Sequence, residues 1–263
     1  MIDRNYYGPW AVIAGGSEGV GAAFAELLSA AGVNLVLIAR KPEPLDETAT
    51  AARANGVEVR TLAMDLLATD ALERIRRVTD DIEVGLLIFN AGANTYSHEF
   101  VTGDLAGFQK VIDLNVTSQL TLSHHFGAVM KERGHGGIML LGSLSGYMGT
   151  MTQSIYSASK AFGRIFAEGL WLELAPFGVH VVELVLGVTR TPAMDRLGLN
   201  YDIPGLNVAE PGDVAREGLE HLADGPLWVA GGNYEAAQKR NGFPRDKLVE
   251  GAAAGMRKLI GRG

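Results

Sequence analysis

A tyrosine and a lysine stand four positions apart in the segment SIYSASKAFG, which spans residues 154–163. On a helix, side chains at positions i and i+4 lie on the same face, so Tyr156 and Lys160 would point in the same direction. An ammonium group beside a phenol stabilises the phenolate and lowers the pKa of the phenol. This pairing predicts a proton donor that works near neutral pH. The alternative is an ordinary surface helix, because the pattern Tyr-x-x-x-Lys also occurs by chance.

A glycine-rich segment follows the first apolar run of the chain. The residues AGGSEGVG (14–21) lie between the run WAVIAG and the helical segment FAELLSAAG. In a strand–turn–helix unit, Gly15, Gly19 and Gly21 allow a tight turn, close approach of a pyrophosphate to the backbone, and close helix–strand packing. The unpaired N–H groups at the start of the helix would hold the anion. This segment predicts a dinucleotide-binding site.

The end of the second apolar run bears on the choice between NAD and NADP. An NAD site usually carries an acidic residue there, which holds the ribose 2′-hydroxyl. This chain has Ala39 at that point, followed by Arg40 and Lys41, whose charges would attract a 2′-phosphate. Glu18 in the glycine turn supplies no positive charge. The sequence favours NADP(H) over NAD(H), and the alternative for Arg40 is an ordinary basic residue that leaves a strand.

Apolar runs alternate with amphipathic stretches along the whole chain. Continuous apolar strands indicate a sheet covered on both faces, and strand–helix alternation indicates parallel pairing. We expect an α/β fold in a single domain over 1–263, a doubly wound parallel sheet (Rossmann fold) of about seven strands with helices on both faces. The expected strands are 10–15, 33–39, 57–63, 84–90, 137–143, 179–185 and 226–230. The expected helices are 19–31, 42–55, 69–80, 104–133, 153–177 and 210–223, followed by a helical C-terminal extension over 232–263.

Composition excludes several classes of function. The 263 residues carry a formal net charge of −7, and the scattered basic residues argue against a nucleic-acid partner. The chain has no cysteine, which excludes disulfides, thiolate metal sites and cysteine nucleophiles. The six histidines lack a metal-ligand spacing, so we expect no metal site. We expect a cytoplasmic protein, because neither a membrane-spanning run nor a secretory signal pattern is found.

Four features together resemble the classical short-chain dehydrogenases/reductases over nearly the whole chain. They are the glycine turn, the tripeptide Asn90-Ala91-Gly92, Ser143 at the end of a strand, and the Tyr156/Lys160 pair. The glycine turn is similar to the family motif Thr-Gly-x-x-x-Gly-x-Gly, with Ala14 where threonine is common.

The resemblance implies a catalytic tetrad of Asn115, Ser143, Tyr156 and Lys160. Tyr156 would protonate the substrate oxygen during hydride transfer, and Ser143 would hydrogen-bond the same oxygen. Lys160 would lower the pKa of the tyrosine and hold the nicotinamide ribose. Asn115 would hold a water that links Lys160 to solvent.

The resemblance also implies the residues that contact the cofactor. Asp65 would contact the adenine ring, and Thr191 would bond the nicotinamide carboxamide. The family's proline before Gly187 is replaced by Leu186, which could loosen this loop but removes no catalytic group. The implied cofactor residues are Gly15, Ser17, Glu18, Gly19, Val20, Arg40, Asp65, Leu66, Asn90, Ala91, Gly92, Tyr156, Lys160, Gly187, Val188, Thr189 and Thr191.

The implied function is an NADP(H)-dependent oxidoreductase that interconverts a ketone or aldehyde and a secondary alcohol. Residues 188–210 occupy the family's substrate-lid position, and Ser145, Met151 and Met194 are expected to line the substrate pocket. Their character favours an apolar or bulky substrate, such as a 3-ketoacyl compound or a steroid ketone. The alternative is a non-catalytic NADP-binding sensor or scaffold on the same fold. A homodimer or homotetramer through the helices 104–133 and 153–177 is expected from the family.

Overall fold

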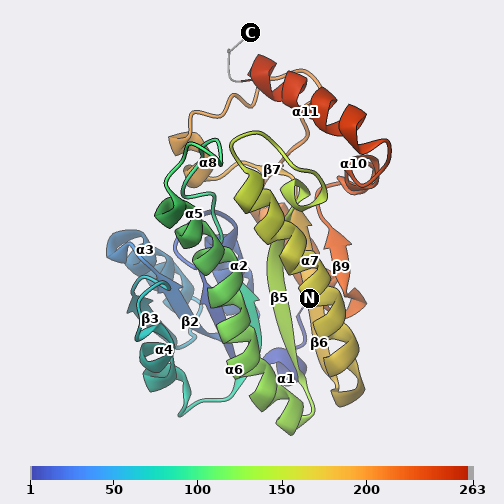
Figure 1. Cartoon of the computed structure of the whole chain (residues 1–263). Coiled ribbons are helices and arrows are strands. Elements are labelled where there is room, and N and C mark those ends of the chain that lie inside the picture. Colours follow the sequence, from blue (N-terminus) through green and yellow to red (C-terminus); the bar gives the residue numbers. More distant parts are fainter. Residues whose placement is uncertain (1, 260–263) are drawn as a thin grey trace.

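A computed structural model describes residues 2–259 of the chain, and Figure 1 shows its helices packed around a central sheet. The sheet has seven strands in the order β3-β2-β1-β4-β5-β6-β9, and every neighbouring pair is parallel. All seven expected strands are confirmed, with ends that differ by at most two residues. The strands are β1 (Trp10–Ala14), β2 (Asn34–Ala39), β3 (Val59–Ala63), β4 (Val84–Phe89), β5 (Gly136–Ser143), β6 (Val179–Leu186) and β9 (Leu227–Val229).

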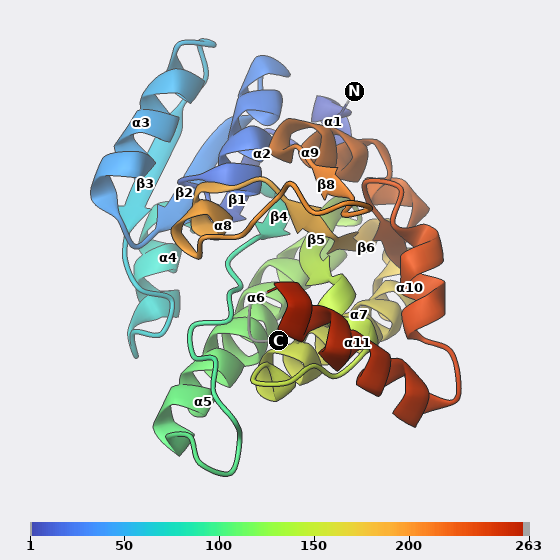
Figure 2. The ribbon, with the colours of Figure 1, turned by 90° about the horizontal axis from the view of Figure 1, so that it is seen from above.

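Helices cover both faces of the sheet, as the strands' apolar character on both sides requires. Successive side chains of a strand point to opposite faces. Ile13 of β1 accordingly packs in one buried cluster with Phe24, and Val12 packs in the other with Phe126. Figure 2 shows the two layers from above. One layer holds α2 (Gly19–Ala30), α3 (Pro42–Arg53) and α9 (Pro211–Glu220), and the other holds α4 (Ala71–Thr79), α6 (Ser118–Arg133) and α7 (Ser154–Leu174).

The remaining elements lie at the ends of the sheet. The 188–210 segment contains a two-stranded parallel ladder and a short helix between its strands. The 232–263 extension is helical in its described part, and residues 260–263 lie outside the described residues. Within residues 2–259, no helix is both long and apolar enough to cross a membrane. These elements are α1 (Arg4–Tyr7), α5 (Leu105–Ile112), β7 (Val188–Thr189), α8 (Pro192–Arg196), β8 (Val208–Ala209), α10 (Tyr234–Arg240) and α11 (Arg245–Leu259).

The expectation of one continuous helix over 104–133 is wrong in one respect. A π-helical turn, Asp113–Thr117, separates α5 from α6, and Asn115 lies in its centre. Two side chains bond to backbone carbonyls here: the Asn115 amide donates to Val111 O at 2.9 Å, and the Ser118 hydroxyl donates to Asp113 O at 3.0 Å. Such π turns inside helices are rare and often mark functional sites.

The strand order reverses direction between β1 and β4, which are neighbours in the sheet. In doubly wound sheets, ligands bind beyond the carboxyl ends of the strands at this switch point. Gly15 follows β1, and Asn90 follows β4. The expected glycine turn and the Asn-Ala-Gly tripeptide therefore meet where this topology places a binding site.

Candidate active site

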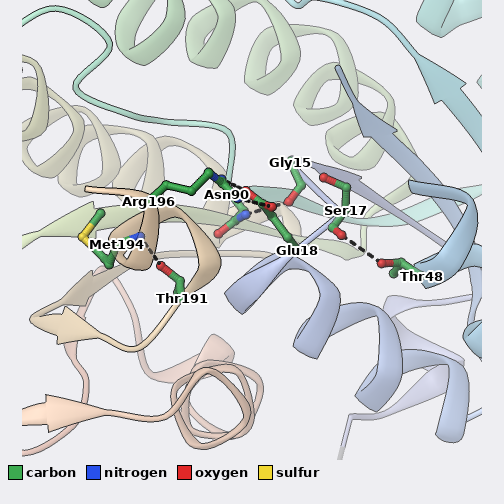
Figure 3. A network of polar contacts seen from close by, with 8 residues as sticks. All are labelled: Gly15, Ser17, Glu18, Thr48, Asn90, Thr191, Met194 and Arg196. Atoms are coloured by element: carbon green, nitrogen blue, oxygen red, sulfur yellow. Dashed lines mark hydrogen bonds and ion pairs between the residues drawn. The ribbon is translucent and has the colours of Figure 1, made fainter. Parts of the chain in front are cut away.

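The turn after β1 has a backbone that requires glycine. Gly15 and Gly19 have positive φ angles of 86° and 57°, which side chains other than glycine rarely adopt. A Cβ atom at Gly21 would lie only 1.9 Å from the Gly15 carbonyl oxygen. Asn90 fixes the turn from the neighbouring strand, because its Nδ2 donates to the same oxygen at 2.7 Å (Figure 3).

The start of α2 suits an anionic ligand. The helix begins at Gly19, and Glu18 is its N-cap residue but makes no side-chain capping bond. The first N–H groups of a helix have no intrahelical partner, and the helix dipole adds positive potential there. The turn can therefore hold a pyrophosphate by backbone N–H groups, as the resemblance implied for a dinucleotide.

The start of the 188–210 segment lies against this turn. A Cβ atom at Gly19 would be 3.0 Å from Thr191 Cγ2, so the Thr191 side chain packs closely against the Gly19 backbone. Thr191 is the N-cap of α8, and its hydroxyl accepts from the Met194 N–H at 3.3 Å (Figure 3). A Cβ atom at Gly187 would lie 2.6 Å from Asn233 Nδ2, so glycine is needed there as well. The fold thus brings Thr191 to the expected cofactor residues of the glycine turn.

Polar residues follow β2 and β3 at the same edge of the sheet. Arg40 and Lys41 are exposed, and both act electrostatically on Glu18, which places them beside the glycine turn. Asp65 is exposed, and its Oδ1 accepts from the Leu67 N–H at 3.0 Å. The basic pair therefore lies near the position expected for a ribose 2′-phosphate.

Lys160 and Asn115 of the expected tetrad converge on Gly92. A Cβ atom there would be 2.7 Å from Lys160 Nζ and 2.9 Å from Asn115 Oδ1. The Lys160 side chain is buried, and its Nζ donates to Leu141 O at 2.8 Å. Asn115 Nδ2 donates to Ala93 O at 3.0 Å, whereas its Oδ1 is buried with no hydrogen-bond partner among the described residues. The Asn115 Oδ1 acceptor and Lys160 Nζ thus both lie beside Gly92.

Ser143 and Tyr156 complete the expected tetrad. Ser143 ends β5, and its hydroxyl accepts from the Ser145 N–H at 3.1 Å. Tyr156 is half-buried on the first turn of α7, one turn before Lys160. A hydrogen bond with Ser143 acts to lower the pKa of Tyr156, which places the two hydroxyl groups together. The lysine Nζ lies 5.7 Å from the centre of the tyrosine ring.

The pKa of Tyr156 departs from the sequence expectation. Burial raises this pKa above its ordinary value and outweighs the Ser143 hydrogen bond. The prediction that Lys160 lowers the pKa of Tyr156 below its ordinary value is therefore wrong. Burial also lowers the pKa of Lys160 to about 8, so the lysine itself is readily neutralised. Desolvation is therefore the largest cause of the pKa shift at both groups.

One buried acid beside the tetrad was missed by the sequence reasoning. Glu183 lies in β6 with 2% of its surface exposed. A Cβ atom at Gly142 would be 2.5 Å from Glu183 Cδ, and one at Gly163 would be 3.2 Å from its Oε1, so these glycines make room for the carboxyl group. Burial raises the pKa of Glu183 to about 8, while Lys160 and Arg164 act in the opposite direction. The available signal was a lone acidic residue inside the apolar run VHVVELV.

The three expected substrate residues lie at the carboxyl end of the sheet. Ser145 lies two residues after Ser143 and is half-buried, as is Met194 in α8. Met151 has 51% of its surface exposed and lies between β5 and α7.

Comparisons with known proteins agree with this geometry. A family model described as short chain dehydrogenase matches residues 9–202. The chain is 31% identical over 251 residues to a 7beta-hydroxysteroid dehydrogenase of Clostridium sardiniense, covering 95% of this chain and 96% of the relative. It is 33% identical to a very-long-chain 3-oxoacyl-CoA reductase of Podospora anserina, covering 72% of this chain and 57% of that protein.

A solved structure, described as a short-chain dehydrogenase from Sphingobium yanoikuyae in complex with NADPH, is similar over 95% of each chain. Its TM-score is 0.78 and its identity is 31%. The bulky-bulky ketone specific alcohol dehydrogenase from Comamonas testosteroni has a TM-score of 0.76 at 26% identity over 94% of each chain. With the sheet order and the glycine turn, these matches show that the chain belongs to the short-chain dehydrogenase/reductase family and is an oxidoreductase acting on CH–OH groups.

Proposed function

We propose that this oxidoreductase is an NADP(H)-dependent carbonyl reductase for apolar or bulky ketones. The observation that carries the proposal is the convergence of Lys160 and Asn115 on Gly92, two residues after Asn90, which holds the glycine turn. The proposed dinucleotide site and the proposed proton-transfer groups thus contact the same short stretch of backbone, residues 90–92.

The chain's own residues supply proton transfer and orientation. The cofactor would supply the hydride. The α2 N-terminus, Thr191 and Lys160 would hold the cofactor. Tyr156 is protonated near neutral pH, since its pKa is not lowered, and its hydroxyl would act as the general acid in carbonyl reduction. Ser143 donates to the substrate oxygen as negative charge develops there. Lys160, readily neutralised, returns a proton to the tyrosine, and Asn115 Oδ1 faces the lysine as an acceptor for a water.

The preference for NADP(H) rests on Arg40 and Lys41. Both are exposed beside the glycine turn, where the second strand ends. No acidic residue stands at the end of β2 to bond a 2′-hydroxyl. The NADPH complex of the Sphingobium yanoikuyae relative supports the same choice.

The substrate class rests on the residues around Ser143. Ser145, Met151 and Met194, with the 188–210 segment as a lid, would give a ketone an apolar cover. Three relatives are named for a hydroxysteroid, a very-long-chain 3-oxoacyl-CoA and a bulky-bulky ketone, and all three names describe large substrates.

Assembly into a homodimer or homotetramer is part of the proposal. Leu120 of α6 and Phe162, Ile165 and Leu172 of α7 expose between 37% and 66% of their surfaces. Light scattering coupled to gel filtration measures the oligomer, and a monomer would contradict this part. The cytoplasmic location stays a prediction.

A ketone panel with NADPH tests the function, and Tyr156→Phe tests the proton donor. The variant loses the acid, so turnover should fall by at least about a hundredfold, while NADPH affinity measured by calorimetry stays within about threefold. Tyr234→Phe is the matched control, because Tyr234 is 61% exposed on α10. Tight NADPH binding without turnover of any ketone would instead support the sensor or scaffold alternative. Wild-type rates in Tyr156→Phe would contradict the assignment.

A further inference from the structure

Arg196 and Glu18 form an ion pair between two segments that are 178 positions apart in the chain. Arg196 ends α8, and Glu18 lies in the glycine turn (Figure 3). Arg196 Nη1 donates to Glu18 Oε2 at 3.0 Å, and Nη2 donates to Oε1. Both carboxylate oxygens are therefore bound by one guanidinium, the two-pronged geometry in which arginine binds carboxylates most strongly.

The position of Glu18 makes its charge a problem for an anionic ligand. It is the N-cap residue of α2, directly before the N–H groups that suit a pyrophosphate. The Arg196 hydrogen bond lowers the pKa of Glu18, so the carboxylate is charged at neutral pH. A free carboxylate at this point would repel a pyrophosphate, and could also take the place of a phosphate on the helix N-terminus.

The same carboxylate lies near the two basic residues that follow β2. Lys41 and Arg40 both contribute to the lowered pKa of Glu18. In the part of the chain that the structure describes, no hydrogen bond or ion pair is found for either basic side chain. The Glu18 carboxylate is instead bound to Arg196, so the positive charges of Arg40 and Lys41 stay available to a ligand.

We propose that Arg196 is a specificity-determining residue for a phosphorylated dinucleotide, because it binds both oxygens of a carboxylate that could otherwise cap the helix N-terminus or pair with Arg40 and Lys41. This inference rests on the proposed NADP(H) function. In this inference Glu18 does not bind the cofactor. Its negative charge opposes phosphate binding, and Arg196 offsets that charge. Arg196 also links the 188–210 segment to the nucleotide site, because Thr191 of the same segment lies against Gly19.

We expect the Arg196–Glu18 pair to contribute little to the free energy of unfolding. The Arg196 and Glu18 side chains are 50% and 29% exposed, so solvent and salt weaken the contribution of the pair to folding stability. We therefore expect Arg196→Gln to leave the thermal midpoint nearly unchanged and to act on nucleotide affinity instead.

The test is a double-mutant cycle in which calorimetry measures the Kd of NADPH and of NADH for the full chain. Arg196→Gln should raise the Kd of NADPH about tenfold, because the freed carboxylate repels both the pyrophosphate and the 2′-phosphate. The Kd of NADH should rise only about twofold to threefold, since NADH lacks the 2′-phosphate. Adding Glu18→Gln should restore the NADPH affinity to within about twofold of wild type. The losses should shrink at high salt, which screens such charges.

Arg190→Gln is the matched control. It removes the same charge from the same segment, where Arg190 pairs with Glu210 at 3.2 Å, and its NADPH affinity should equal that of wild type. The inference is overturned if Arg196→Gln leaves both affinities unchanged, or if Glu18→Gln fails to reverse its effect. If wild type binds NADH as tightly as NADPH, the proposed cofactor preference fails. In that case Glu18→Gln should still reverse the effect of Arg196→Gln on the Kd of both dinucleotides, because both carry the pyrophosphate. A failure of the cofactor preference is therefore distinguishable from a failure of the Arg196 inference.

Discussion

The buried Glu183 should make the stability of this protein depend on pH in an unusual direction. Burial raises its pKa from 4.5 to about 8, so between these values the folded chain keeps a proton that the unfolded chain releases. The free energy of unfolding must therefore fall as the pH rises through this window. At about 1.4 kcal/mol per pKa unit, the shift corresponds to on the order of 5 kcal/mol. Lys160 acts at higher pH: its pKa is lowered from 10.5 to about 8, so its contribution rises again above pH 8.

Glu183→Gln removes the titrating group while keeping the size of the side chain. The variant should lose the decrease in stability between pH 5 and pH 8. Lys160 would also lose the carboxylate that favours its charged form, so its pKa should fall further and the rise in stability should begin at a lower pH. The wild-type and variant curves should therefore diverge with increasing pH by several kcal/mol.

Urea unfolding at pH 5, 6, 7 and 8, followed by tryptophan fluorescence, measures this divergence. Glu173→Gln is the control, because it makes the same chemical change at an exposed position of α7. Carboxylates elsewhere titrate in both proteins and cancel in the difference. Parallel curves for wild type and Glu183→Gln would refute the reasoning, since they would mean that Glu183 titrates in the folded chain as it does in the unfolded one.

Two further substitutions test the cofactor and proton-transfer sites. Arg40→Asp replaces an exposed cation beside the glycine turn by an anion. The ratio of kcat/KM for NADPH to that for NADH should fall about tenfold or more, and an unchanged ratio would contradict the proposed preference. Gly92→Ala would place a methyl group 2.7 Å from Lys160 Nζ and displace the lysine. Steady-state kinetics should then show kcat about a hundredfold lower, with circular dichroism as the check that the fold survives; a wild-type kcat would show that Lys160 tolerates the displacement.

The sequence predicted the strands and the glycine turn because those depend on local patterns. The seven expected runs became seven parallel strands, and the glycine turn takes the tight backbone path that its glycines suggested. The π-helical turn at Asn115 could not be predicted, because the apolar periodicity of 104–133 does not reveal a change of one residue in the helical repeat. The raised pKa of Tyr156 was missed because desolvation depends on what packs around a side chain. The contact between Arg196 and Glu18 was missed because nothing local connects these positions.

The Asn90-Ala91-Gly92 segment connects the two halves of the proposed reaction. Asn90 holds the glycine turn through its side chain, and its backbone N–H donates to Ala14 O at 2.9 Å. Two residues later, Gly92 lies directly against the polar atoms of Lys160 and Asn115. A hydride donor on the turn and a proton source on α7 must reach one carbonyl group together, and small displacements of reacting groups are costly. Because the segment is anchored at both ends, it fixes the spacing between the glycine turn and the lysine.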